Sequence, residues 1–222
     1  MVRAGPSMTF LPSLPVFLAY LAAVLVITFT PGPDMTLFLG KAVRQGMASG
    51  MAAMLGASAG VLIHTTLVAV GLSALLAANA TAFLVLKVAG ALYLLWLAVQ
   101  AIRHGSAFSL DPATATGARQ PLLSTWLQGL AVNLLNPKII MFFVTFLPQF
   151  VAVGDPNATG KLIFLGVVFV AISVPICGAM IASASRLSAF LKRSPRVMRA
   201  VDWLFACVFG AFAARLLLAR AD

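Results

Sequence analysis

Long apolar segments alternate with short polar connections along the whole chain. Each apolar segment has about 20 residues or more, the length of an α-helix that crosses roughly 30 Å of hydrocarbon. The alternating pattern of membrane β-strands is absent, and backbone groups in lipid must be satisfied within a helix or a closed barrel. The pattern therefore predicts an all-α membrane protein with six transmembrane helices, at about Leu14–Gly40, Ala48–Ala77, Ala80–Ile102, Leu122–Phe150, Leu162–Ser185 and Val197–Leu218.

The longest polar stretch, residues 104–121, divides the chain into two parts with three predicted helices each. Because the number of helices in each part is odd, the second part runs through the membrane upside down relative to the first. Many secondary transporters have this arrangement. We therefore expect a single transmembrane domain over residues 1–222, made of two inverted repeats at about 14–103 and 122–220.

The composition fits this architecture. Of the 222 residues, 62% are hydrophobic and 9% charged, with a mean hydropathy of +1.05, which is more apolar surface than a soluble domain of this size can bury. The net charge of +10 would suggest nucleic acid in a soluble protein. Here the Lys and Arg residues gather between apolar segments, as the positive-inside rule expects, so we predict no nucleic-acid partner. The same rule predicts that both termini lie outside and that the connections at 41–47, 103–121 and 186–196 are cytoplasmic.

The first predicted helix contains a proline motif in its apolar interior. Pro31 and Pro33 have no amide hydrogen, so two carbonyls one turn earlier lose their usual helical donors. These are the carbonyls of Ile27 and Phe29. The helix should therefore break near Gly32.

The fourth predicted helix contains the same order of a cap residue, a proline and a charged residue as the first. Such a set of three residues suits the start of a half-helix, with free amide groups pointing into the break. At about 1.5 Å per residue, the breaks lie about 12 Å and about 20 Å from the cytoplasmic ends of their helices, on either side of the midplane. The two sets are Gly32-Pro33-Asp34 and Asn136-Pro137-Lys138.

This pairing predicts a site for a zwitterion. Free amides at a half-helix start attract anions, and carbonyls freed by proline attract cations. We expect an ammonium group near Asp34 and the freed carbonyls, and an α-carboxylate near Lys138. Asn133, one turn before Pro137, is a candidate for the same break. The alternatives are an ion pair between Asp34 and Lys138 that only holds two helices together, or side chains that each extend toward a membrane interface. A charge inside a span is usually functional or paired with another charge.

Two further titratable residues lie in apolar segments. His64 lies well inside the second predicted helix and has an unperturbed pKa near neutral, so it suits a proton relay with Asp34. The alternative is a neutral histidine bonded to a backbone carbonyl. Asp202 follows Arg199 by three residues, and we favour half of a surface pair over a second proton acceptor.

Small residues recur at helical spacing in the second segment, at Gly46 and Gly50 and again at Gly56 and Gly60. Such pairs allow close approach of helices. We favour packing inside the bundle over the seam of a homodimer.

Four segments occur in an order that is typical of one family: "TPGPDMTLFLGKAVRQG", "GVLIHTTLVAVGLSALL", "KVAGALYLLWLAVQAIR" and "NLLNPKIIMFFVTFLPQF". Together they resemble the LysE/RhtB family of bacterial amino-acid exporters over essentially the full length. The family's Pro-Gly-Pro, Asn-Pro-Lys and Pro-Gln-Phe motifs fall on Pro31, Gly32 and Pro33, on Asn136, Pro137 and Lys138, and on Pro148, Gln149 and Phe150. Asp34 matches the acidic residue that follows the first motif in many members.

The resemblance implies a multi-pass protein of the bacterial inner membrane that exports amino acids or close derivatives. It implies the proton motive force as the driver, and we expect no cofactor. The expected mechanism is proton-coupled antiport by alternating access, with Asp34 and His64 handling the proton. The expected substrate-binding residues are Pro31, Gly32, Pro33, Asp34, Asn133, Asn136, Pro137 and Lys138.

An enzyme is not expected, because the sequence shows no spacing typical of a nucleophile with its base or of a metal cluster. A passive channel, or an exporter of another small solute or of a metal ion, is the alternative. A divalent metal would want several carboxylates or histidines at depth, so we expect no metal site.

Overall fold

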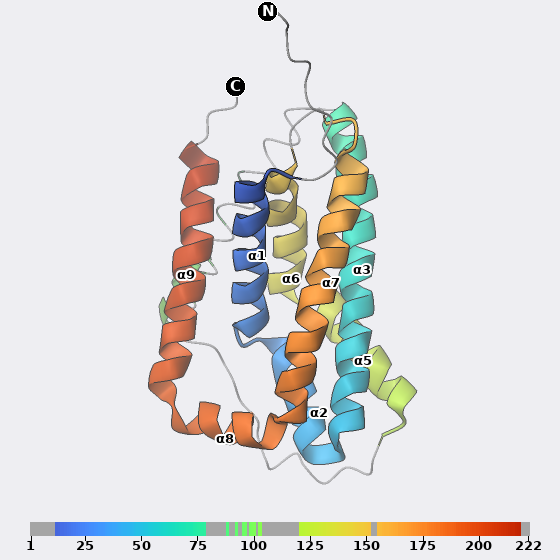
Figure 1. Ribbon diagram of the computed structural model, residues 1–222, viewed down its shortest axis with the longest axis vertical. Coiled ribbons are helices and arrows are strands. Elements are labelled where there is room, and N and C mark those ends of the chain that lie inside the picture. Colours follow the sequence, from blue (N-terminus) through green and yellow to red (C-terminus); the bar gives the residue numbers. More distant parts are fainter. Residues whose placement is uncertain are drawn as a thin grey trace, which may run out of the picture.

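The computed structural model describes residues 12–78, 120–151 and 155–218, together with single positions between 88 and 103. The described elements are all helices, and they stand as an upright bundle with α8 lying across its lower end (Figure 1). In chain order they are α1 (Leu14–Phe29), α2 (Pro33–Gln45), α3 (Met47–Ala78), α5 (Leu122–Leu134), α6 (Pro137–Met141), η2 (Phe142–Phe146), η3 (Leu147–Phe150), α7 (Ala158–Ala182), α8 (Ala184–Arg193) and α9 (Pro195–Leu218).

Both predicted helix breaks are present. The axis bends by 51° between α1 and α2 and by 53° between α5 and the segment Pro137–Phe150. Gly32 is the N-cap of α2, and Asn136 is the N-cap of α6, where its side chain accepts a hydrogen bond from the Lys138 amide at 3.1 Å. A proline occupies the first turn in each case, so the prediction of a cap, a proline and a charge is confirmed.

The described helices account for part of the predicted spans. Within the described ranges, α3 and α7 are long and apolar enough to cross a membrane, and the number of such spans rises to 4 if each bent pair is counted as one. The predicted helix at 80–102 and the linker at 104–121 fall almost wholly outside the described residues. The sixth predicted segment is helical, as α9.

Two connections that the sequence predicts as loops are helical instead. In the segment 41–47, α2 continues to Gln45 and α3 begins at Met47, so Gly46 alone makes the turn. Its φ of 93° lies in the left-handed region that favours glycine. The segment 186–196 is mostly α8, which is also why α7 ends at Ala182 rather than Ser185. A high density of arginine and lysine conceals the amphipathic pattern of this helix.

The helices α3 and α5 approach each other until their backbones touch. A Cβ atom at Gly56 would lie 1.9 Å from the carbonyl oxygen of Trp126, and one at Gly129 would lie 1.9 Å from that of Ala53. Gly50 and Gly60 also face other helices of the same chain. At these three positions of α3 the small residues serve packing inside the bundle, as we favoured.

A layer of aromatic side chains lies in the core that α1, α7 and α9 share with η2 and η3. Phe142, Phe143 and Phe146 are fully buried, and Phe142 lies 5.4 Å from Phe169 between ring centroids. The Tyr20 hydroxyl donates to a carbonyl of α7 at 2.6 Å. This layer fixes the upper halves of α1, α7 and α9 against the segment that follows the second break.

The reciprocal glycine contact gives a test of the packing. We expect Gly56→Ala to lower the free energy of unfolding by about 1–3 kcal/mol, because the added methyl forces two backbones apart. Thermal unfolding in detergent, followed by circular dichroism, measures the effect. The matched control is Gly71→Ala on the same helix, where a Cβ atom meets nothing within 4 Å. Equal melting temperatures for the two variants would contradict the assigned contact.

Candidate functional site

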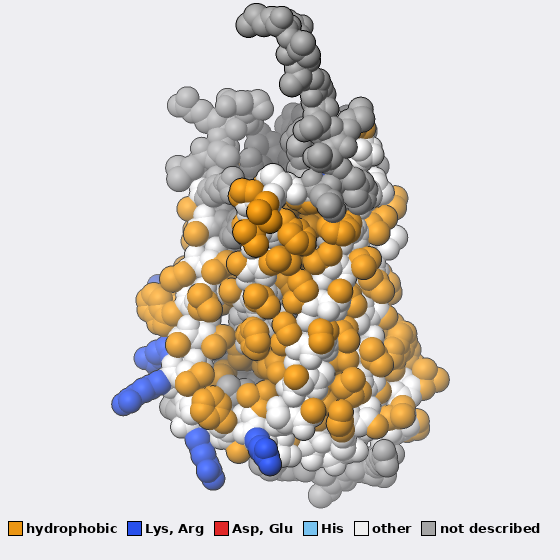
Figure 2. Space-filling model, in the orientation of Figure 1, with side chains coloured by type: hydrophobic (Ala, Val, Ile, Leu, Met, Phe, Trp, Pro, Cys, Tyr) orange, Lys and Arg blue, Asp and Glu red, His pale blue; other side chains and the backbone are white. Residues whose placement is uncertain are grey.

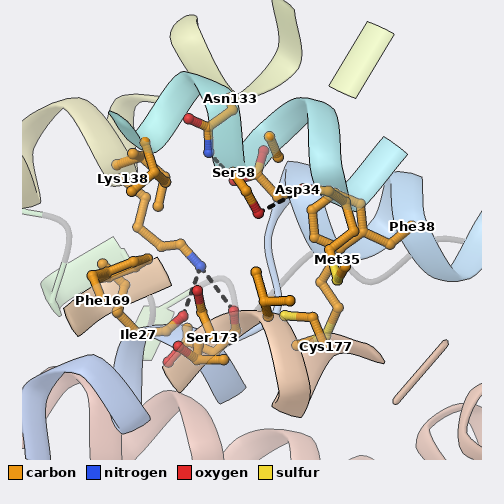
Figure 3. A pocket seen from close by; sticks show the side chains of 17 residues that line it. Ile27, Asp34, Met35, Phe38, Ser58, Asn133, Lys138, Phe169, Ser173 and Cys177 are labelled. Carbon is orange, nitrogen blue, oxygen red and sulfur yellow. Dashed lines mark hydrogen bonds between the residues drawn. The ribbon is translucent and has the colours of Figure 1, made fainter. Parts of the chain in front are cut away.

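The two helix breaks line one pocket in the bundle, between α1, α2, α3, α5, α6 and α7 (Figure 3). Each of these six helices, or the break beside it, contributes to the polar lining. The polar side chains are Thr28, Thr30, Asp34, Ser58, Asn133, Lys138 and Ser173. The remaining walls are apolar apart from the thiol of Cys177, with Met35, Phe38 and Phe169 as the largest contributors.

Lys138 reaches across the pocket to the end of α1. Its ammonium donates to the carbonyl of Thr30 at 2.8 Å and to that of Ile27 at 3.3 Å. The Ile27 carbonyl is one of the two that the prolines deprive of a helical donor. Lys138 therefore supplies the donor that is missing at the first break.

Gly32 leaves the room for this contact. A Cβ atom at Gly32 would lie 3.1 Å from the Lys138 ammonium nitrogen and 3.4 Å from its ε-carbon. The backbone of Gly32 is extended, with φ −170°, which any residue can adopt. Space beside Lys138, rather than backbone freedom, is the reason for glycine at this position.

Asp34 is held by the other broken helix. Its Oδ2 accepts a hydrogen bond from the Asn133 side-chain amide at 2.8 Å, whereas its Oδ1 is buried and has no hydrogen-bond partner in the part of the chain that the structure describes. Asn133 is 1% exposed and packs against Gly60, where a Cβ atom would come within 2.5 Å of its Oδ1. One carboxylate oxygen is thus fixed by a hydrogen bond, and the other has no donor among the described residues.

The charges of Asp34 and Lys138 interact across the pocket, but no ion pair joins these two described residues. The ion-pair alternative is therefore wrong for this conformation. The structure also differs from the expectation that the freed carbonyls wait for a ligand, because Lys138 already occupies that of Ile27.

The pocket is small in this conformation. The free volume that the centres of water molecules can reach is about 60 Å³. Since one water needs roughly 10–15 Å³ on this measure, the space holds a few waters rather than a whole amino acid. A larger ligand therefore requires a lining side chain to move, and Lys138 is the one that crosses the space (Figure 3).

Several buried polar atoms near the breaks have no hydrogen-bond partner among the described residues. Besides Asp34 Oδ1, they include Asn133 Oδ1, Asn136 Nδ2 and His64 Nε2. His64 is 8% exposed, and its ring stacks on Phe143 with centroids 6.0 Å apart. Because buried polar atoms are rarely left unpaired, this group of atoms marks a place for water, a proton or a ligand.

The structure places only some of the predicted site residues in the lining of the pocket. Asp34, Asn133 and Lys138 line the pocket, while His64 is buried outside its lining. The others form the breaks behind the pocket without lining it, and they are Pro31, Gly32, Pro33, Asn136 and Pro137. Asp202, which we interpreted as a surface residue, is 3% exposed on α9 and does not line the pocket.

Sequence reasoning missed the pocket walls that come from α3 and α7. Ser58 follows Met54 by four residues, and on α7 Phe169, Ser173 and Cys177 follow one another at the same spacing. This spacing places each set on one helix face. The signal is readable in the sequence, but it does not distinguish a face toward a pocket from a face toward lipid.

Comparison with known proteins confirms the resemblance to a family of amino-acid exporters. The family profile described as LysE type translocator matches residues 25–220. The homoserine/homoserine lactone efflux protein of Salmonella typhimurium is 32% identical over 202 residues, which cover 91% of this chain and 96% of that protein. The leucine efflux protein of Enterobacter sp. is 28% identical over 200 residues, covering 90% and 94%. No solved structure matches the chain. The chain belongs to the LysE type translocator family.

A double-mutant cycle tests whether Asp34 and Lys138 act as one charge-balanced unit. We expect Asp34→Asn and Lys138→Met each to lower the free energy of unfolding by about 1–3 kcal/mol, because each leaves the opposite charge uncompensated. The double variant should be more stable than the sum of the two effects predicts, by about 1 kcal/mol. Unfolding in detergent gives all four values.

Lys138→Gln separates the two roles of the lysine, since an amide can still donate to the carbonyls but carries no charge. If the effects of Asp34→Asn and Lys138→Met simply add in the double variant, the two charges are independent and the charge balance that we assign is wrong.

Proposed function

We propose that this chain is a secondary active exporter of amino acids or close derivatives, and that it works as a proton-coupled antiporter by alternating access. The observation that carries the proposal is the pocket between the two helix breaks, where a lysine ammonium lies opposite a carboxylate with one oxygen that no described residue pairs. The relatives are named for the efflux of homoserine, homoserine lactone and leucine, which all carry an α-amino group, and homoserine and leucine also carry an α-carboxylate.

Recognition begins with the amino group of the substrate. That group is a cation like the Lys138 ammonium, so it competes for the carbonyls of Ile27 and Thr30 and for the free oxygen of Asp34. The displaced lysine then turns toward the substrate's α-carboxylate, and this movement also makes the room that the pocket lacks. The apolar residues Met35, Phe38 and Phe169 face the substrate side chain.

Proton coupling follows from the same carboxylate. Asp34 exchanges its proton while the site faces one side of the membrane and binds the ammonium while it faces the other. His64 lies among the unpaired atoms near the breaks and is the candidate for passing the proton onward. The proton motive force drives the cycle, with no cofactor required.

The proposed architecture is six spans in two inverted repeats in the bacterial inner membrane. The Gly46 turn, the start of α5 and α8 lie at the same end of the bundle (Figure 1). Lys41 at that end donates to Gln120 at 2.7 Å, which ties the first of these connections to the second. These observations support a common, cytoplasmic side for the three basic connections.

Transport itself provides the direct test. Proteoliposomes loaded with a mixture of labelled amino acids should lose a few species when a pH gradient is imposed, and Asp34→Asn should abolish this gradient-driven loss while leaving the protein folded. Loss without any dependence on the gradient would indicate a passive channel. Retention of every species would overturn the proposal in favour of another solute or a metal ion.

Cys177 provides a test of binding that does not depend on coupling. Its thiol lines the pocket, whereas Cys207 lies exposed on α9. In a Cys207→Ala background, a transported amino acid should slow the alkylation of Cys177 by N-ethylmaleimide at least threefold. A non-transported amino acid of similar size is the control. Equal alkylation rates with both would place the substrate elsewhere.

A further inference from the structure

A second cavity opens at the lower part of the bundle, where α8 passes beneath α1 and α9. We call it the apolar groove, and its main walls are Phe29, Met180, Leu187, Phe190, Val201 and Leu204. Among the described residues that line it, Thr30 is the only one with a polar side chain. The free volume that water centres can reach is about 410 Å³, compared with about 60 Å³ in the pocket between the breaks.

A groove of this kind needs an apolar occupant. Water gains little in it, because a stable buried water requires two to four polar partners, and the lining offers almost none. Several of the wall residues are themselves well exposed, including Leu204 at 53% and Phe190 at 52%. The groove therefore opens on the outer surface of the bundle, where acyl chains are the surrounding solvent.

The rim of the groove carries a concentration of positive charge. Arg186 precedes the wall residue Leu187 on α8, and Arg196 precedes the wall residue Val197 on α9. Figure 2 shows basic side chains projecting from this lower end of the molecule. The exposed arginines are Arg186, Arg193, Arg196 and Arg199.

The orientation of α8 places these charges at the level of lipid headgroups. The helix lies across the end of the bundle rather than along it (Figure 1). It presents apolar residues to the groove and arginines to the outside, as helices at a membrane interface do. Juxtamembrane clusters of Lys and Arg attract anionic lipids for electrostatic reasons.

A second copy of the chain is a poorer occupant than a lipid. Among the described residues, the acids that a copy offers are Asp34, Asp155 and Asp202. Asp202 is buried, Asp34 lies in the pocket, and Asp155 pairs with Lys161 at the start of α7, at the opposite end of the bundle. No described acid of a copy is thus placed to meet the arginines.

We propose that the apolar groove binds an anionic phospholipid, with one acyl chain between α1, α8 and α9 and the phosphate on the arginines of the rim. The site is separate from the pocket between the breaks and stands whether or not amino acids are the cargo. An acyl chain supplies the missing apolar contacts, and the phosphate supplies negative charge for the arginines.

The test uses the full chain, purified in a neutral detergent and stripped of lipid, with binding followed by native mass spectrometry. Phosphatidylglycerol should bind at least tenfold more tightly than phosphatidylcholine with the same acyl chains. Arg196→Gln together with Arg199→Gln should weaken phosphatidylglycerol binding about 25-fold, at about fivefold for each charge near the surface. Glycerol 3-phosphate and diacylglycerol, each with half of the lipid's chemistry, should both bind weakly.

Val201→Phe fills the groove without changing any charge and should weaken phosphatidylglycerol binding more than fivefold. The matched control is Val167→Phe on α7, a residue that is 50% exposed outside the groove and should leave binding unchanged. Equal binding of the two phospholipids would reduce the groove to ordinary lipid contact and overturn the proposal. A dimer that Val201→Phe dissociates would overturn it in favour of a second copy.

Discussion

The structure depends on one constraint, which is that a helix broken inside lipid must find new donors for the carbonyls released at the break. Here the donor comes from the other broken helix. Lys138, just after the second break, donates to carbonyls just before the first. Asn133, just before the second break, donates to Asp34, just after the first. The first break is completed by a residue of the second, whereas the carbonyl that Pro137 releases, that of Asn133, accepts from the neighbouring Asn136 amide at 3.0 Å. The two side-chain contacts nevertheless tie the broken helices to each other.

These contacts explain why the pocket is polar and why a ligand can open it. Lys138 holds the breaks together through carbonyl oxygens, and Asn133 holds them together through the Asp34 carboxylate. The ammonium group of a ligand can bind to the same carbonyls and to the same carboxylate. The aromatic layer around Phe142 packs one part of the bundle tightly, whereas the pocket between the breaks has room for only a few waters. Movement at the site therefore has to begin with the side chains that cross it, since the packed layer resists deformation.

The sequence was sufficient to locate the breaks, because the absence of a proline N–H is a local fact that no tertiary contact can reverse. It was also sufficient to place Asp34 and Lys138 in one site, from the repeated cap, proline and charge. It did not reveal that Lys138 turns back onto the Ile27 carbonyl, because this depends on the distance between two helices and on the space beside Gly32. Nor did it reveal α8, since Leu187 and Phe190 stand among basic residues whose average polarity resembles that of a loop.

Thr30 and Met35 belong to the lining of both cavities, and they flank the first break. The wall between the apolar groove and the pocket is therefore formed by the break itself, where Lys138 holds the Thr30 carbonyl from the side of the pocket. An acyl chain in the groove would support the break from behind, at the point where the lysine holds it from the front. When a ligand displaces Lys138, the acyl chain in the groove is the remaining support of the first break. The bound lipid and the ligand in the pocket therefore act on the same few residues.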